Sequence, residues 1–272
     1  MKNINIIGCG LMGSQIASLF SIMGYKVNIW NRTKIDEINL LRQKKIILKL
    51  LKTQDFNGKI NIVENFEDLR NNVTIESLTE DINLKKSFFT KLDQKISKEI
   101  FTNSSSIKTN KISNKLNLLH FFNPIYLRII EYRLINKLSN EAGMIFSDLK
   151  KMNFELVEVG NFTGYAFNKV LFSQVSNFFL LIEHENIKKE KILKIFKKIN
   201  NNLDVLHTLD LIGIDVSLNI LENLKEEYNY YVPEILYLCK SKKIYGKKNK
   251  TSIKSIFESP DYPKVKNDRS SK

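Results

Sequence analysis

The sequence predicts an α/β protein, in which a doubly wound, mostly parallel sheet is followed by a smaller, all-helical domain. Two observations predict this division. Up to Gly160, short apolar runs of strand length alternate with amphipathic runs of helix length, which is the order of elements in a doubly wound sheet. After Gly164, apolar residues recur at helical spacing and strand patterns become rare.

The individual elements of the first half are predicted from apolar periodicity. Strands are expected at 3–7, 26–30, 60–64, 73–78, 98–102, 116–120, 127–133 and 154–160, and helices at 14–24, 34–56 and 83–96. The first strand, a glycine-rich turn, a helix and the second strand follow one another in the order of a βαβ unit. The resulting boundaries are 1–160 for the sheet domain, 161–258 for the helical domain and 259–272 for a mobile tail.

Composition excludes several classes of protein. No apolar run reaches the ~18–20 residues that span a bilayer, and the early first strand leaves no room for a signal peptide. The two cysteines, Cys9 and Cys239, suggest neither a disulfide framework nor a zinc site, so we expect no metal and a cytoplasmic location. The net charge of +14 permits an anionic ligand. Abundant Asn and Ile with dispersed Lys indicate an AT-rich genome instead of a nucleic-acid partner.

The turn GCGLMG fits the pattern G-x-G-x-x-G between a strand and a helix, the context that indicates a Rossmann dinucleotide site. Gly8 permits the tight turn, Gly10 allows close approach of a pyrophosphate, and Gly13 allows the helix to pack on the strand. Leu11 and Met12 begin a helix whose N-terminus attracts phosphate. A glycine turn that binds no ligand is the alternative.

The residues after the second strand bear on the choice of cofactor. A site for NAD places an acid there, which bonds the ribose 2′-hydroxyl and repels a 2′-phosphate. This chain has Asn31, Arg32 and Thr33, of which Arg32 can clamp a phosphate and Thr33 can donate to it. The sequence therefore favours NADP(H) over NAD(H), unless Arg32 only stacks on the adenine or faces solvent.

His120 ends the strand predicted at 116–120, and Glu131 is a lone acid in the next apolar run. Ligands of an open α/β sheet bind beyond the carboxyl ends of its strands, and histidine is the residue type that exchanges protons near neutral pH. A catalytic base also needs a partner that orients its second nitrogen, which Glu131 could supply. The alternatives are a structural histidine, and a buried Glu paired with Lys or Arg.

The strings GCGLMGSQIA, ESLTEDINLKKSFFTKLD, FTNSSSI, HFFNP with a later Glu, and TGYAFNK occur in the order found in the 3-hydroxyacyl-CoA dehydrogenase family. The chain resembles that family, which includes 3-hydroxybutyryl-CoA dehydrogenases, over residues 3–250. The resemblance implies a dinucleotide-binding domain and a helical domain that binds substrate and forms a homodimer. It also implies reversible oxidation of a 3-hydroxyacyl thioester, carried by coenzyme A or acyl carrier protein, to the 3-ketoacyl form.

The same resemblance assigns roles to individual residues. His120 is expected to be the general base that takes the hydroxyl proton as hydride leaves, with Glu131 orienting it. Ser105 is expected to bond the reacting oxygen, and Asn168 to hold the substrate's oxygens or the histidine loop. The positions expected near the nicotinamide ribose are Glu80, Lys85 and Asn103.

The chain departs from the family pattern in several places. The segment NPIYLRIIE is one residue shorter than usual, and a slip of one residue would turn Glu131 to the other face of its strand. A Gly- and Pro-rich stretch beside the acyl pocket is replaced by NNNLDVLHTLDLIGID, the final GKKTGxGFY by GKKNKTSIKSIF, and the Pro before Gly164 by Thr163.

These departures keep two alternatives open. One is a non-catalytic relative that binds a nucleotide or thioester and acts as an interaction protein. The other is a β-hydroxyacid dehydrogenase that acts on free acids, a class whose catalytic lysine is matched here by Asn168, with Lys169 about 100° further around the helix.

The predicted helix at 34–56 is rich in cations, namely Arg42, Lys44, Lys45, Lys49 and Lys52. In the family, a helical excursion at this place holds part of the coenzyme A nucleotide. Lys44, Lys45 and Lys49 are therefore expected to bind the phosphates of the thioester or an acidic carrier protein. The alternative is a solvated helix face in a lysine-rich protein, screened by salt beyond about 8 Å.

Overall fold

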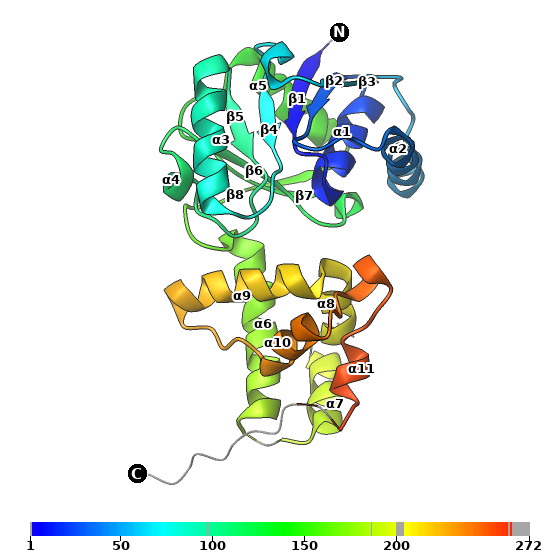
Figure 1. Ribbon diagram of the computed structural model, residues 1–272, viewed down its shortest axis with the longest axis vertical. Helices are drawn as coiled ribbons and strands as arrows, with labels where there is room; N and C mark the ends of the chain where they lie inside the picture. The colour runs from blue at the N-terminus through cyan, green and yellow to red at the C-terminus, as the bar shows by residue number, and fades with distance from the viewer. Residues whose placement is uncertain (1, 97, 186, 200–203, 261, 263–272) are drawn as a thin grey trace. The chain divides into compact units, whose positions relative to one another are not determined.

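The computed structural model describes residues 2–260 and 262, apart from 97, 186 and 200–203 (Figure 1). The chain divides into two compact units, Met1–Tyr165 and Ala166–Lys272. The division falls at the start of the long helix α6 (Tyr165–Glu183), a few residues after the last strand of the sheet. Each unit is described below by itself.

The first unit is built on one sheet, which has eight strands in the part of the chain described. In chain order these are β1 (Asn3–Ile7), β2 (Lys26–Trp30), β3 (Lys59–Ile62), β4 (Thr74–Glu76), β5 (Ile100–Thr102), β6 (Asn117–Phe121), β7 (Ile129–Arg133) and β8 (Glu155–Glu158). Their spatial order is β3-β2-β1-β4-β5-β6-β7-β8. Among the described pairs, β6 with β7 is antiparallel and the others are parallel, which confirms the predicted fold class.

The predicted strands are present, but several have different bounds. β4 and β5 are shorter than predicted because their ladder joins three residues on each strand. β6 ends one residue later than predicted, at Phe121, which pairs with Ile130. His120 is therefore the penultimate residue of β6 and takes part in the antiparallel ladder.

Two groups of helices cover the two faces of the sheet (Figure 1). The helices of the first unit are α1 (Leu11–Ile22), α2 (Glu37–Leu51), α3 (Ile82–Lys95), α4 (Thr109–Ile112) and α5 (Asn140–Lys151), with short 3-10 turns at Phe66–Asp68 and Ile125–Leu127. Because side chains alternate along a strand, Ile6 of β1 packs with α1, α2 and α5, whereas Ile7 packs with α3 and α4.

Helix α2 is shorter than the predicted helix at 34–56. It begins after Asp36, whose carboxylate accepts a hydrogen bond from the Asn39 amide at 3.0 Å. It ends at Leu51, and the next residue, Lys52, adopts the left-handed conformation common after the last helical turn.

The second unit consists of helices in the part described, as predicted after Gly164. They are α6, α7 (Lys189–Ile199), α8 (Val205–Ile212), α9 (Ile214–Tyr228), α10 (Glu234–Ser241) and α11 (Lys254–Phe257), with a 3-10 turn at Gly246–Asn249. None of the helices described is both long and apolar enough to cross a membrane. Most of the tail predicted at 259–272 lies outside the described residues, but Tyr262 is buried and its hydroxyl donates to Glu183 at 2.9 Å.

Candidate active site

The turn between β1 and α1 requires two of its glycines for the reasons predicted. Gly8 has a φ of +96°, a conformation that side chains disfavour, and a Cβ there would lie 2.5 Å from the carbonyl oxygen of Ser77. A Cβ at Gly13 would lie 2.0 Å from the carbonyl oxygen of Gly8. Gly8 therefore permits the turn, and Gly13 permits the close packing of α1 on the turn.

Gly10 differs, because a Cβ there would meet nothing within 4 Å. The packing of the protein does not itself require glycine at this position, and space is left in front of the turn. The amides of Leu11, Met12 and Gly13 have no hydrogen-bond partner in the part of the chain described, and α1 has no side-chain cap. Open space beside unpaired donors at a helix N-terminus fits a pyrophosphate.

Asn31 ties the end of β2 to the glycine turn. Its Oδ1 accepts from the Cys9 amide at 3.1 Å, and its Nδ2 donates to Oγ1 of Thr33 at 2.9 Å. Arg32 and Thr33 are exposed, and Arg32 has no hydrogen-bond or ion-pair partner among the described residues. The guanidinium is therefore available to a ligand at this end of the sheet.

Glu80 organises the loop that follows β5. Its carboxylate accepts from the Ser104 hydroxyl at 3.0 and 2.9 Å and from the Ser105 amide at 2.6 Å. The Ser105 hydroxyl also donates to Glu80, at 3.3 Å. The expected bond from Ser105 to a reacting oxygen therefore stays a prediction that requires this hydroxyl to turn. Sequence reasoning missed Ser104, whose signal was the serine run NSSS.

Lys85 lies in a buried ion pair. It is 2% exposed, and its Nζ donates to Glu76 at 2.7 Å and to the carbonyl oxygen of Leu78 at 3.2 Å. Glu76 accepts in addition from the Thr102 hydroxyl at 2.7 Å and from the Leu78 amide at 2.5 Å. The expected position of Lys85 near the ribose stays a prediction, and the sequence analysis did not identify Glu76.

Asn103 joins the ends of two neighbouring strands. It follows β5 directly, and its Oδ1 accepts from the Phe121 amide of β6 at 2.8 Å. The side chain therefore holds the backbone beside His120 in place. A contact with the cofactor ribose, which the resemblance implied, stays a prediction.

His120 and Glu131 face each other across β6 and β7. They are partners in the antiparallel register, and Nδ1 of His120 lies 2.9 Å from Oε2 of Glu131. Their exposed fractions are 6% and 1%. The predicted contact is confirmed, and the shorter connection has not moved Glu131 to the other face. A 3-10 turn and the left-handed Arg128 complete that connection.

The ring of His120 lies close to two aromatic side chains. Its centroid lies 5.2 Å from that of Phe122 and 6.2 Å from that of Tyr165. Burial, followed by the nearby carboxylates of Glu80 and Glu131, raises the pKa of Tyr165, so its hydroxyl stays protonated and donates to the carbonyl oxygen of Ile107 at 2.6 Å. Nε2 of His120 has no hydrogen-bond partner among the described residues. Sequence reasoning assigned no role to Tyr165, although it lies in the quoted string TGYAFNK.

The other predicted site residues belong to α6 and α2. Asn168 lies in the first turn of α6 and belongs to the second unit, so its role stays a prediction. Lys44 forms an ion pair with Asp55 at 2.9 Å, whereas Lys45 and Lys49 are exposed on α2. No group of three or more His, Cys, Asp or Glu side chains is placed to hold a metal ion in the part described.

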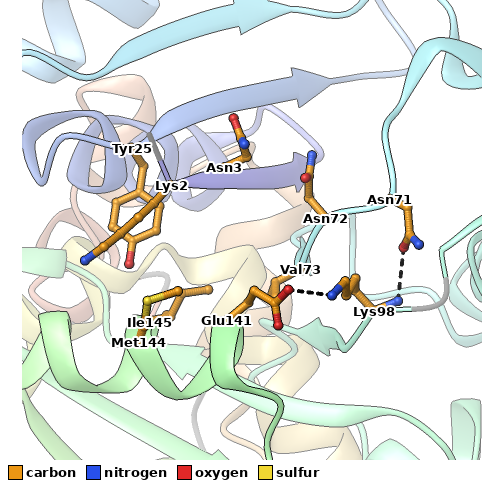
Figure 2. Close-up of a pocket in the computed structure, with 10 residues that line it drawn as sticks. All are labelled: Lys2, Asn3, Tyr25, Asn71, Asn72, Val73, Lys98, Glu141, Met144 and Ile145. Atoms are coloured by element: carbon orange, nitrogen blue, oxygen red, sulfur yellow. Dashed lines mark hydrogen bonds and ion pairs between the residues drawn. The ribbon is translucent and has the colours of Figure 1, made fainter.

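A cavity of about 330 Å³ lies at the other end of the sheet, near the amino ends of β1, β4 and β5 and against α5 (Figure 2). Figure 2 shows Lys98 bonded to Glu141 and to Asn71 at its edge. Lys2, on the opposite side, forms an ion pair with Asp148. The cations that line the cavity are thus neutralised, and we assign it no catalytic role.

Comparison with protein families decides the identity of this arrangement. The family model described as 3-hydroxyacyl-CoA dehydrogenase, NAD binding domain, matches residues 3–132, and the model of the C-terminal domain of the same family matches residues 164–258. The chain belongs to the 3-hydroxyacyl-CoA dehydrogenase family. This membership confirms the resemblance inferred from the motifs, the dehydrogenase class and the nicotinamide cofactor, and it disfavours the alternative family that acts on free acids. The preference between NADP(H) and NAD(H) stays a prediction.

Individual members of the family are similar over most of their length. The chain is 28% identical to a 3-hydroxybutyryl-CoA dehydrogenase of Clostridioides difficile, covering 82% of this chain and 87% of the relative. The crystal structure of FadB2 of M. tuberculosis superposes with a TM-score of 0.79 at 20% identity, covering 93% of this chain and 98% of that one. A (S)-3-hydroxybutyryl-CoA dehydrogenase from Ralstonia eutropha gives 0.76 at 21% identity, covering 93% and 98%. These structural likenesses show the shared fold.

Proposed function

We propose that this chain interconverts a 3-hydroxyacyl thioester and its 3-ketoacyl form, with His120 as the general base. The observation that carries the proposal is the buried His120–Glu131 pair, which holds one ring nitrogen and leaves Nε2 without a partner among the described residues. The relative from Clostridioides difficile is named for 3-hydroxybutyryl-CoA, which supports a thioester as the substrate.

The geometry of the pair assigns each nitrogen a task. A carboxylate beside Nδ1 favours the tautomer that carries the ring proton there, so Nε2 of the neutral ring is the acceptor. In the oxidation direction, Nε2 takes the substrate's hydroxyl proton, and Glu131 stabilises the imidazolium that forms. The nicotinamide supplies the acceptor for the hydride when it is bound. Ser105 and Asn168 are the proposed donors to the substrate oxygen.

The cofactor proposed is NADP(H), with NAD(H) as the alternative. The glycine turn and the amides at the start of α1 would hold the pyrophosphate. Asn31 is engaged with the turn, and no carboxylate follows β2 to repel a 2′-phosphate. Exposed Arg32 would clamp that phosphate, with Thr33 beside it. Three residues are proposed to lie near the nicotinamide ribose. They are Glu80 in the loop after β4, Asn103 in the loop after β5, and Lys85 on α3.

We also propose that the protein is a cytoplasmic homodimer formed through its helical unit. Exposed aliphatic side chains on that unit support an interface, since Val170 of α6 is 61% exposed and Ile199 of α7 is 73% exposed. Light scattering of the purified protein should give the mass of two chains. A monomeric mass at micromolar concentration would contradict this part of the proposal.

Initial rates with acetoacetyl-CoA and each reduced cofactor test the proposed reaction. We expect turnover with NADPH at a higher kcat/KM than with NADH. Binding of cofactor and thioester without any turnover would instead favour the non-catalytic relative that the departures from the family pattern keep open.

Arg32→Ala tests the cofactor assignment. It should weaken NADPH binding about tenfold or more, the scale of one charge-assisted contact, and change NADH binding far less, because only NADPH carries the 2′-phosphate. Lys34→Ala, which removes an exposed cation two residues further along, is the matched control. Equal losses for both cofactors would show that Arg32 does not recognise the phosphate.

A further inference from the structure

Helix α2 exposes more apolar surface than a solvated helix needs. The exposed fractions of its aliphatic side chains reach 82% at Ile38, 60% at Leu41, 39% at Ile46 and 45% at Leu50. Helix α3 packs on the other face of the sheet and is one residue shorter, and it exposes no large apolar side chain. Helices α6 and α7 also expose aliphatic side chains, among them Val170, Ile195 and Ile199, but α2 exposes four within its fifteen residues. A patch concentrated in this way marks an interaction site.

The same side of α2 carries cations. Arg42, Lys45 and Lys49 are exposed and follow Ile38 at spacings of four, three and four residues, which places them on one face of the helix. None of these three cations has an ion-pair partner among the described residues, whereas Lys44 is neutralised by Asp55. We define the outer face of α2 as Ile38, Leu41, Arg42, Lys45, Ile46, Lys49 and Leu50.

The arrangement of these side chains restricts what can cover them. A second copy of this chain that packed its own α2 on this one across a two-fold axis would bring the three cations against one another. A helix that lies in a lipid surface separates its apolar and basic faces, whereas here Arg42, Lys45 and Lys49 lie among the aliphatic residues. An acidic protein surface that also carries apolar residues complements both the cations and the aliphatic side chains of the outer face.

We propose that the outer face of α2 docks an acidic, amphipathic helix of a carrier protein that presents the acyl group on a phosphopantetheine thioester. The proposal rests on the proposed function, since it names the carrier of the same substrate. Ile38 and Leu50 lie about 18 Å apart along the helix axis, at 1.5 Å for each residue. A partner helix covers that length, whereas the nucleotide of free coenzyme A pairs with cations at one place and leaves the other aliphatic residues exposed.

Two double variants distinguish the contribution of charge to docking from the contribution of apolar contact. Lys45→Glu with Lys49→Glu inverts the charge of the outer face, and Ile38→Gln with Ile46→Gln removes part of its apolar surface. Lys86→Glu with Lys91→Glu is the matched control, because it makes the same change of charge at exposed positions of α3. Each protein is assayed with acetoacetyl carrier protein and with acetoacetyl-CoA under saturating cofactor.

For both outer-face variants, the ratio of the KM for the carrier-bound substrate to the KM for acetoacetyl-CoA should rise about tenfold or more. Saturating turnover should change little, because docking binds the ground state and the transition state alike. The control should keep the wild-type ratio. A ratio that neither pair changes would overturn the proposal. The proposal would also be overturned if Lys45→Glu with Lys49→Glu raised both KM values equally and Ile38→Gln with Ile46→Gln changed neither. The cations would then bind the phosphates of coenzyme A.

Direct binding separates failure of docking from failure of the proposed reaction. Fluorescence anisotropy of labelled acyl carrier protein should show binding to wild type, and both outer-face variants should lose it, whether or not turnover is detected. Turnover of acetoacetyl-CoA without any carrier binding would overturn the docking proposal and leave the proposed function standing. Wild-type binding to phosphatidylglycerol vesicles in place of the carrier protein would overturn it in favour of a membrane surface.

Discussion

The first unit contains two buried acid–base pairs that are built differently. Glu76 accepts from Lys85, from Thr102 and from a backbone amide, and Lys85 donates to a second acceptor, so this pair is closed. Glu131 holds one nitrogen of His120, and the other nitrogen has no partner among the described residues. An ammonium presents all its protons from one atom, whereas an imidazole has nitrogens on opposite sides. His120 can therefore be held by Glu131 through one nitrogen while its other nitrogen exchanges a proton.

The largest effect expected from this comparison is on stability at the closed pair. Lys85→Met should lower the free energy of unfolding by about 3–5 kcal/mol, because the carboxylate of Glu76 would stay buried without its cation. Urea denaturation measures the change. Lys86→Met, at the exposed neighbouring position, should stay within about 0.5 kcal/mol of wild type. A loss below about 1 kcal/mol at Lys85 would show that the pair does not hold the fold.

At the His120–Glu131 pair the main effect should be on the rate of the reaction. His120→Asn should lower kcat with acetoacetyl-CoA by at least ~10²-fold, because the amide replaces the nitrogen that bonds Glu131 but not Nε2. Cofactor affinity, measured by fluorescence titration, should be nearly unchanged. His120→Ala should lose the same activity and, in addition, some stability, since Glu131 then loses its contact with His120. Turnover near that of wild type in either variant would remove His120 from the mechanism.

The partner of the histidine should have a smaller effect on rate. Glu131→Gln should lower kcat by about 10–100-fold, the usual cost of losing the group that orients a functional histidine. The neutral amide can still contact Nδ1, but it no longer stabilises the imidazolium. Steady-state kinetics at fixed pH measure the loss. If Glu131→Gln costs more than His120→Asn, Glu131 has a role beyond positioning.

The smallest effect is expected where an acid lies near solvent. Burial tends to raise the pKa of Asp148, but hydrogen bonds from Lys2 and Tyr25 outweigh it, and the pKa lies below the ordinary 3.8. Below about pH 4 the native state thus binds fewer protons than the unfolded chain, so this stabilisation is present above that pH and is lost as pH falls through the depressed pKa.

Asp148→Asn should accordingly lower stability at pH 7 by no more than about 1 kcal/mol, because the pair is partly solvated. The difference from wild type should shrink at pH 3, where the carboxyl of the unfolded chain is already largely protonated. Urea denaturation of both proteins at the two pH values makes the comparison. A difference that is the same at both would contradict the assigned cause.

The strand pattern and the glycine turn were predictable from sequence because they depend on local properties. Gly8 and Gly13 are required by a conformation and a close contact within one turn. Strand bounds were less predictable, because a ladder such as that of β4 with β5 ends where the neighbouring strand ends. The end of α2 at Leu51 likewise depends on the left-handed conformation of Lys52, which is not predictable from a lysine in the sequence.

The sequence by itself determined that a histidine and a glutamate would lie on consecutive strands at the ligand-binding end of the sheet, since periodicity and the turn motif are local. Only the tertiary structure decided that His120 and Glu131 share one register position, because the connection between the strands sets that register. It also decided that Glu80 holds the serine loop and that Asp55 neutralises Lys44. The partners in these contacts are separated in sequence, and only the packing of the chain brings them into contact.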